Sequence, residues 1–330
     1  PPPHFTGRRQ RQMCIRDSPE AEQSEPYIHH FPDGNSTIAR KLVCRLIPDL
    51  VSGNSLENLI TAKLDYGLLD DPRNDVSVRL NSTVINVQNN KSAGGTVTVS
   101  YVRDNQLEKV SASKCILACN SNVIPFICPE LPDKQKEALA FQVKVPILYT
   151  NVAVKSWEAW KNLGIGAMVC PGSYHIVSML DFPVTYGNYE FSRNEREPIV
   201  IHMERFPHSY GSNLSAREQY KLGRYELLTT PFETIERNVR EQLESSLSEG
   251  GFNAAKDILG ITVNRWSHGY SYWYNPLFDP IYDDYNDSRY PHIIGRKKYG
   301  NITIANADSA ANAMLESAIE EAYRAVSELI

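Results

Sequence analysis

The stretch YGNITIANADSAANAMLESAIEEAYRAVSELI, residues 299–330, decides the fold expected for this chain. An apolar strand around Ile302 and Ile304 leads into a turn of Ala, Asn, Ser and Asp308, and an amphipathic helix starts near Met314. Small side chains let a ligand approach the backbone closely, and the first turn of a helix favours a negatively charged ligand group. Two interpretations follow: a nucleotide site with Asp308 near a sugar hydroxyl, or a packed helix that Asp308 caps. Composition alone favours the second.

Length and composition indicate a globular chain of about two domains. The sequence has 330 residues, of which 42% are hydrophobic, and a formal net charge of −5. The mild charge and the lack of a basic stripe argue against a nucleic-acid partner. No apolar run approaches the ~20 residues that a membrane helix needs. The six cysteines form no CxxC pair and no disulfide-like spacing, so most are expected to be small buried hydrophobic residues.

Residues 1–25 are expected to lie outside the fold. They show no periodicity and no apolar face, and QMCIRD (12–17) resembles a translated sequencing adapter. The segment is therefore interpreted as a reading artefact or, alternatively, as a disordered tail. In the first case the natural protein continues upstream with further sequence.

The rest of the chain mixes helix and strand patterns, which predicts an α/β chain with α+β character. Helices are predicted from periodicity and stop signals over 36–45, 58–69, 133–141, 230–251 and from about 314. Strands are predicted over 97–101, 114–120, 145–154, 174–180, 198–206, 258–266 and 302–304. Residues 276–292 predict a loop rich in Pro, Asp and Tyr.

Several segments together resemble the FAD-dependent amine oxidases, and among them the bacterial polyamine dehydrogenases of the spermidine dehydrogenase type. They are FPDGNSTIARKLV (31–43), CPELP (128–132), KVPILYTNVAV (144–154), PGSYH (171–175), MLDFPV (179–184), NRWSHGYSYWYNPLFD (264–279) and IANAD (304–308) with SAI (317–319). The resemblance covers about residues 27–329. It implies a two-domain flavoprotein in which residues 26–142 belong to a Rossmann-like FAD domain, 143–290 form a mixed-sheet substrate domain, and 291–330 close the FAD domain.

The FAD domain is expected to be incomplete, because GxGxxG, the fingerprint that opens such domains, does not occur. The resemblance implies that Asp308 meets the ribityl or pyrophosphate part of FAD. It also implies that the backbone of Met314 and Leu315 lies near the flavin pyrimidine edge and that the backbone of Val84 meets the adenine. One departure is that alanines, Ala310 and Ala311, stand where many flavin enzymes have glycine in the final turn.

Three residues are expected to serve the chemistry. Lys144 resembles the lysine that holds a water beside flavin N5, although an ordinary surface lysine at a strand end would look the same. Trp266 and Tyr270 belong to an aromatic cluster, NRWSHGYSYWYNP (264–276), that could line an ammonium site. The resemblance places them near the flavin, whereas packing on a neighbouring sheet is the commoner fate of such a stretch.

Asp33, Asp181 and Glu204 lie beside apolar residues and are the candidates for binding the remote ammonium groups of a polyamine. Such carboxylates often pair with an arginine instead, and Arg205 is adjacent to Glu204.

The function implied is oxidation of an amine by hydride transfer to FAD, with electrons passed on to oxygen or another carrier. Haem accompanies FAD in spermidine dehydrogenases, but CxxCH is missing, and none of the candidate histidines (His29, His30, His175, His202, His268) is assigned as a ligand. Two alternatives stay open: another flavoenzyme of this architecture, such as a desaturase, and a binding protein without catalysis. Without a phosphate-binding loop, the 330 residues alone are expected to be inactive.

Overall fold

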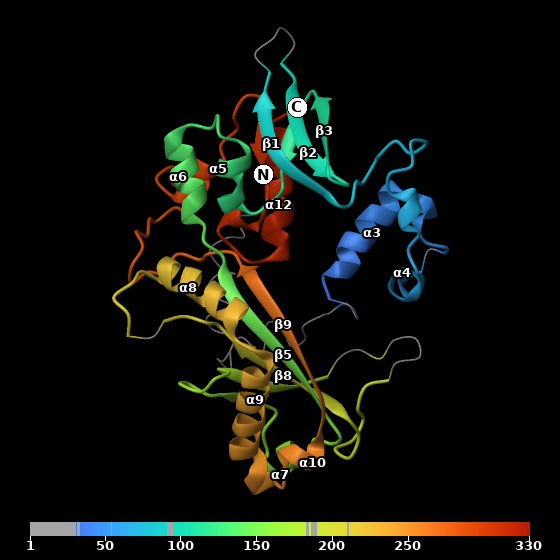
Figure 1. Ribbon diagram of the computed structural model, residues 1–330, viewed down its shortest axis with the longest axis vertical. Coiled ribbons are helices and arrows are strands. Elements are labelled where there is room, and N and C mark those ends of the chain that lie inside the picture. The colour runs from blue at the N-terminus through green and yellow to red at the C-terminus, as the bar shows by residue number, and fades with distance from the viewer. Residues whose placement is uncertain are drawn as a thin grey trace. The chain divides into compact units, whose positions relative to one another are not determined.

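The computed structural model describes residues 31, 34–53, 55–90, 95–182, 185, 190–209 and 211–330. They divide into two compact units. The first contains Pro1–Arg79 with Val184–Tyr189 and Tyr282–Asp287, and the second contains the remaining residues (Figure 1). No helix in the described ranges is long and apolar enough to cross a membrane.

The described part of the first unit contains the helices α3 (Ser36–Leu46) and α4 (Leu56–Thr61). Its small core includes Ile47, Leu50 and Leu69. The helix predicted over 36–45 is confirmed. The helix predicted over 58–69 is confirmed only as far as Thr61, because the chain becomes extended at Ala62 and resumes as a 3-10 turn at Tyr66–Leu68. The Asp65 side chain caps that turn by accepting a hydrogen bond from the Gly67 N–H group.

A five-stranded antiparallel sheet dominates the second unit. Its strands run in the order β6 (Ala167–Val169), β7 (Val177–Asp181), β8 (Ile199–Arg205), β5 (Val145–Val154) and β9 (Ile258–Tyr270). In β5 the residues from Leu148 to Val154 that face one side of the sheet are all buried. They pack against α8 (Ala216–Thr229) and α9 (Phe232–Leu247), as Figure 1 shows, with α7 (Glu158–Leu163) and α10 (Ala254–Asp257) at one end.

The register between β5 and β9 shifts at Pro146. Val145 is opposite Tyr270 and Ile147 is opposite Trp266, so β9 uses two more residues than β5 over the same length. Proline has no N–H group to donate to the ladder, which explains why a central strand tolerates it only beside a bulge. Because the bulge adds an even number of residues, Trp266 and Tyr270 stay on the same face of the sheet.

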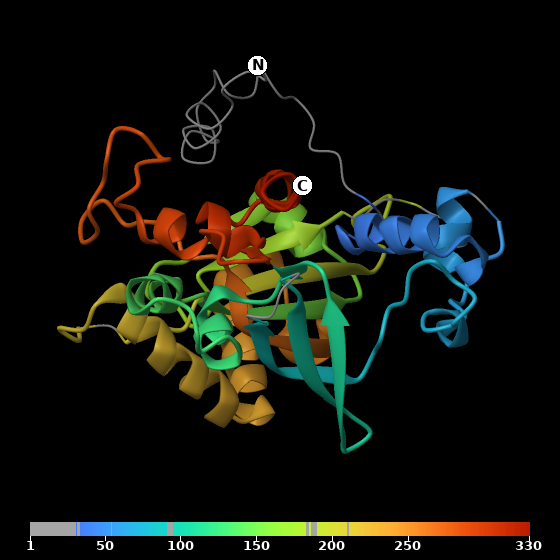
Figure 2. The same cartoon turned by 90° about the horizontal axis from the view of Figure 1, so that it is seen from above.

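The second unit also holds a smaller, nucleotide-fold-like part. Strand β4 (Cys115–Leu117) pairs in parallel with β10 (Ile302–Ile304), and α12 (Leu315–Ser327) follows β10. Beside them, β1 (Ser82–Asn89), β2 (Val97–Arg103) and β3 (Gln106–Ala112) form an antiparallel sheet, the cyan to green strands of Figure 2. Three further helices belong to this part: α5 (Ile124–Ile127), α6 (Asp133–Phe141) and α11 (Pro291–Gly295). The strand and helix predicted at the end of the chain are confirmed.

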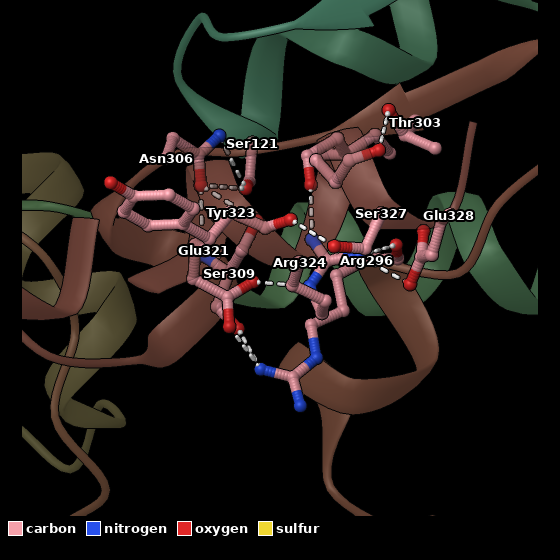
Figure 3. A network of polar contacts seen from close by, with 12 residues as sticks. Ser121, Arg296, Thr303, Asn306, Ser309, Glu321, Tyr323, Arg324, Ser327 and Glu328 are labelled. Atoms are coloured by element: carbon pink, nitrogen blue, oxygen red, sulfur yellow. Dashed lines mark hydrogen bonds and ion pairs between the residues drawn. The ribbon is translucent and has the colours of Figure 1, made fainter. Parts of the chain in front are cut away.

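Ion pairs fasten α12 to the rest of this part (Figure 3). Glu321, buried on α12, contacts Arg296 through one carboxylate oxygen and the Arg324 Nε atom through the other, at 2.8 Å. Arg324 also donates to the Ile304 carbonyl at the end of β10. The Glu328 carboxylate accepts from Arg324 Nη1 at 2.6 Å. The closing helix is thus held to the closing strand by charged hydrogen bonds as well as by apolar packing.

A buried histidine makes the stability of the sheet depend on pH. His175 is fully buried, its Nε2 atom lies 3.0 Å from Thr150 Oγ1, and Gln242 of α9 binds its backbone N–H group. Burial, and next the charge of Arg205, lowers the pKa of His175 to about 3. Between its ordinary value of about 6.5 and about 3, the unfolded chain therefore binds a proton that the folded chain excludes.

We expect the free energy of unfolding to fall as the pH falls through that window. Urea unfolding at a series of pH values measures the slope, which should become shallower in His175→Gln. The variant His208→Gln, with a half-buried histidine elsewhere in the unit, is the control and should keep the wild-type slope. Equal slopes in wild type and His175→Gln would contradict the expectation.

Candidate functional site

Lys144 and Asp308, predicted from distant parts of the chain, form a buried ion pair. Lys144 Nζ lies 2.7 Å from Asp308 Oδ1, and the two side chains are 9% and 0% exposed. Lys144 Nζ also donates to Ser271 Oγ at 3.2 Å, and the Ser121 N–H group donates to Asp308 Oδ2 at 3.0 Å. Lys144 is therefore not a surface lysine, and Asp308 binds a side chain and a loop instead of capping the last helix.

These four residues come from four strand ends. Lys144 directly precedes β5 and Ser271 directly follows β9, whereas Ser121 and Asp308 lie in the turns after β4 and β10. Since β4 and β10 are parallel, their carboxyl ends lie at one edge, which is where open α/β sheets bind ligands. The pair thus joins the large antiparallel sheet to the nucleotide-fold-like part of the same unit.

The turn after β10 is shaped by side chains that bind the backbone. Asn306 Oδ1 accepts from the Ser309 N–H group at 2.8 Å, and Asn306 Nδ2 donates to the Cys119 carbonyl after β4. Ala311 has φ +45°, the left-handed region that glycine adopts at no steric cost, and its methyl group is fully buried. Alanine therefore stands here in a conformation that glycine would favour, at a position where the resemblance leads one to expect glycine.

The residues expected to contact the cofactor lie in two places, at the start of α12 and in β1. Met314 is the residue before α12, its side chain is 41% exposed, and it makes no side-chain cap, while Leu315 is the first helical residue. The first N–H groups of a helix lack intrahelical acceptors, so this end of α12 suits a negatively charged or electron-rich group. Val84 lies in β1, where it pairs with Tyr101 of β2 beside a bulge.

Three predicted residues share the face of the large sheet that α8 and α9 do not cover. Trp266 and Tyr270 of β9 are 56% and 43% exposed, and Glu204 of β8 lies opposite Tyr149 of β5. The hydroxyl groups of Tyr149 and Tyr270 are hydrogen-bonded, with 2.6 Å between the two oxygens. The exposure of Trp266 and Tyr270 contrasts with the alternative in which they pack on a neighbouring sheet.

A histidine connects Glu204 to the next strand. His202 lies 3.0 Å from Asn151 Oδ1 through Nδ1 and 3.3 Å from Glu204 Oε1 through Nε2. Arg205 instead pairs with Glu226 of α8 at 2.7 Å. The arginine pairing considered for Glu204 from the sequence is therefore wrong.

Of the two other candidate carboxylates, the structure describes Asp181. Asp181 ends β7 opposite Val200 and is exposed, on the same face as Glu204 by strand alternation. Asp33 lies outside the described residues. Haem finds no support in His175, which is enclosed in the core, or in His202, whose two ring nitrogens both have partners. His29 and His30 lie outside the described residues.

The aromatic cluster divides into exposed and buried members. Trp266 and Tyr270 end the strand on its open face, whereas Tyr272 and Tyr274 are 2% and 4% exposed. Tyr272 donates to the Asp279 carboxylate, and the Tyr274 hydroxyl bonds His292. Tyr272 and Tyr274 therefore support the loop that follows the strand.

Arg224 is a site residue that the sequence did not reveal. Its Nη2 atom donates to the Lys144 carbonyl and its Nε atom to the Ser267 carbonyl, both at 3.0 Å. The helix that carries it, α8, was not predicted, although Ser215 and Glu218 form a capping box that the spacing S-x-x-E signals. Arg224 thus ties the start of β5 to the bulge in β9.

Comparison with solved structures identifies the fold. The chain has the mixed α/β fold of amine oxidases. It matches cyclohexylamine oxidase from Brevibacterium oxydans IH-35A with a TM-score of 0.50 at 12% identity, over 74% of this chain and 47% of that one. It matches the A394C mutant of putrescine oxidase with a TM-score of 0.50 at 15% identity, over 76% and 48%. The chain thus spans about half the length of these oxidases. No protein-family model and no curated protein sequence matches it.

Proposed function

We propose that this chain is part of an FAD-dependent oxidoreductase that oxidises a primary or secondary amine, a polyamine such as spermidine, by hydride transfer to the flavin. The observation that carries the proposal is the buried Lys144–Asp308 pair, at the carboxyl ends of β4 and β10 in a fold shared with amine oxidases. Because the chain spans about half of those proteins, the activity is proposed for the whole protein. The 330 residues by themselves are proposed to be inactive.

The residues fit a flavin nucleotide at this edge of the sheet. The uncapped start of α12 at Met314 and Leu315 offers N–H groups, and the small side chains of the preceding turn would let a ligand approach the backbone closely. Asp308 and the backbone of Val84 complete the proposed cofactor contacts. Bound FAD would supply the acceptor for the hydride from the amine carbon. Asp308 also forms an ion pair with the ammonium group of Lys144.

The open face of the large sheet provides the proposed amine site. The faces of Trp266 and Tyr270 would attract a cationic ammonium group. Glu204, with Asp181 and Asp33 as further candidates, would bind remote ammonium groups by charge. Lys144 is held by Asp308 and Ser271 and is proposed to orient a water at the reacting end. These carboxylates favour an amine over the uncharged substrate of a desaturase.

The test uses the full-length protein, including whatever precedes residue 27 in the gene. We expect it to be purified with FAD, and spermidine to bleach the flavin absorbance under anaerobic conditions faster than butylamine. Lys144→Met should slow the reduction by about 100-fold, a typical loss for a group that assists proton transfer. Lys136→Met, at a residue that pairs with Asp133 on the surface, is the matched control. A full-length protein that no amine reduces would overturn the proposal.

A further inference from the structure

The bulge in β9 places a histidine beside the Lys144–Asp308 pair. Ser267, His268 and Gly269 are the bulged residues opposite Pro146. A Cβ atom on Gly269 would lie 2.5 Å from Ile147 Cδ1, so the backbone packs closely there. Bulges next to active sites commonly redirect a side chain, and His268 is the middle residue of this bulge.

One nitrogen of the His268 ring is fixed and the other is available. Nδ1 lies 2.8 Å from Ser267 Oγ. When Nδ1 carries the hydrogen and donates it to Ser267, the lone pair of Nε2 is open to accept a proton. Among the described residues Nε2 has no hydrogen-bond partner, and the residue is exposed. His268 also lies between Trp266 and Tyr270 in sequence, the two aromatic residues of the open face.

Burial and the neighbouring charges disfavour the protonated form of the His268 ring. Partial burial, and then the positive charges of Arg224 and Lys144, lower the pKa of His268, while Asp308 acts in the opposite direction. Arg224 is held by the carbonyls of Lys144 and Ser267, so its charge is fixed next to the bulge. A neutral imidazole is the form that can take up a proton near neutral pH. The same two cations disfavour an ammonium ion at this place and so lower the pKa of a bound amine.

We propose that His268 is the base that removes a proton from the reacting ammonium group of the substrate before hydride transfer. This inference rests on the proposed function, since only a neutral amine has the nitrogen lone pair that expels a hydride. In the step, an N–H bond of the ammonium breaks and its electron pair stays on nitrogen. The proton forms a new N–H bond at His268 Nε2, and the exposed imidazolium passes it to solvent. His268 is a catalytic residue in this scheme, and Arg224 and Ser267 are positioning residues.

The decisive experiment follows anaerobic flavin reduction by spermidine against pH in the full-length holoenzyme. For His268→Gln we expect a rate about 100-fold below wild type at pH 7. The loss should shrink as the pH approaches about 10, the ordinary pKa of an alkylammonium group, where the amine arrives neutral. Ser267→Ala keeps the imidazole and should lose much less. His208→Gln is the matched control and should keep the wild-type profile.

The outcomes separate the two proposals. If amines reduce the wild type and His268→Gln shows the same pH profile, His268 is not the base and the proposed function stands. If no amine reduces the wild type, the proposed function fails and this proposal falls with it. A second readout needs no cofactor: in NMR titrations of the 330-residue chain, His268 should titrate below about 6.5, and Arg224→Gln should raise its pKa. A His268 pKa that Arg224→Gln leaves unchanged would also overturn the proposal.

Discussion

Replacing Asp308 with asparagine should destabilise the chain by about 3–5 kcal/mol, the usual cost of removing one partner of a buried ion pair. The carboxylate is fully buried, and its partner Lys144 is 9% exposed. In the variant the ammonium group of Lys144 would stay in the interior with Ser271 as its remaining side-chain partner. The amide of asparagine can still accept from the Ser121 N–H group, so the loss reports mainly the missing charge.

Urea unfolding of the 330-residue chain measures this effect. The matched control is Asp133→Asn, which breaks the Asp133–Lys136 pair at 2.9 Å, where the Asp133 side chain is 89% exposed. Exposed pairs of this kind contribute little, so its unfolding midpoint should stay close to wild type. The double variant Asp308→Asn with Lys144→Met should regain part of the stability, because no buried charge is left unpaired. Equal midpoints for Asp308→Asn and Asp133→Asn would contradict the account.

The sequence was most informative where a pattern is local. Strand β5 has the bounds that its apolar run predicts, and α6 has the bounds of its predicted helix. The start of α12 at Leu315 lies one residue from the predicted start near Met314. By contrast, β9 continues four residues beyond its prediction, to Tyr270, because pairing with β5 extends the strand past Trp266 and across the bulge. That pairing is a long-range contact, which local periodicity does not encode.

For the site as well, local patterns indicated single residues but not the contacts between them. Lys144 and Asp308 could each be selected from the sequence, but their ion pair depends on how the strand ends meet. Ser121 and Ser271 were missed, although Ser121 directly follows a predicted strand, because a serine in a turn is too common to signal a role. Arg224 was missed together with its helix. The resemblance to amine oxidases suggested the residues at the reacting end, and the packing of strands and helices explains how they are held.

Glu321 should matter for stability as much as Asp308. Its side chain is 8% exposed, and its two oxygens contact two arginines, Arg296 and Arg324 (Figure 3). Replacing Glu321 with alanine keeps a strong helix former in α12 but leaves both guanidinium groups, 17% and 20% exposed, without their shared carboxylate. We expect a loss of about 3–5 kcal/mol.

The neighbouring residue provides the control for this prediction. Glu320 is exposed on the same helix, so Glu320→Ala makes the same chemical change and should leave the urea midpoint nearly unchanged. Hydrogen exchange can localise the effect, since the amides of α12 should lose protection in Glu321→Ala before those of β5 do. Because Arg324 also donates to the Ile304 carbonyl, freeing α12 should loosen the end of β10 as well. A uniform loss of protection across β5, β10 and α12 would mean that α12 does not open separately. An unchanged urea midpoint in Glu321→Ala would mean that the two arginines do not need the Glu321 carboxylate for stability.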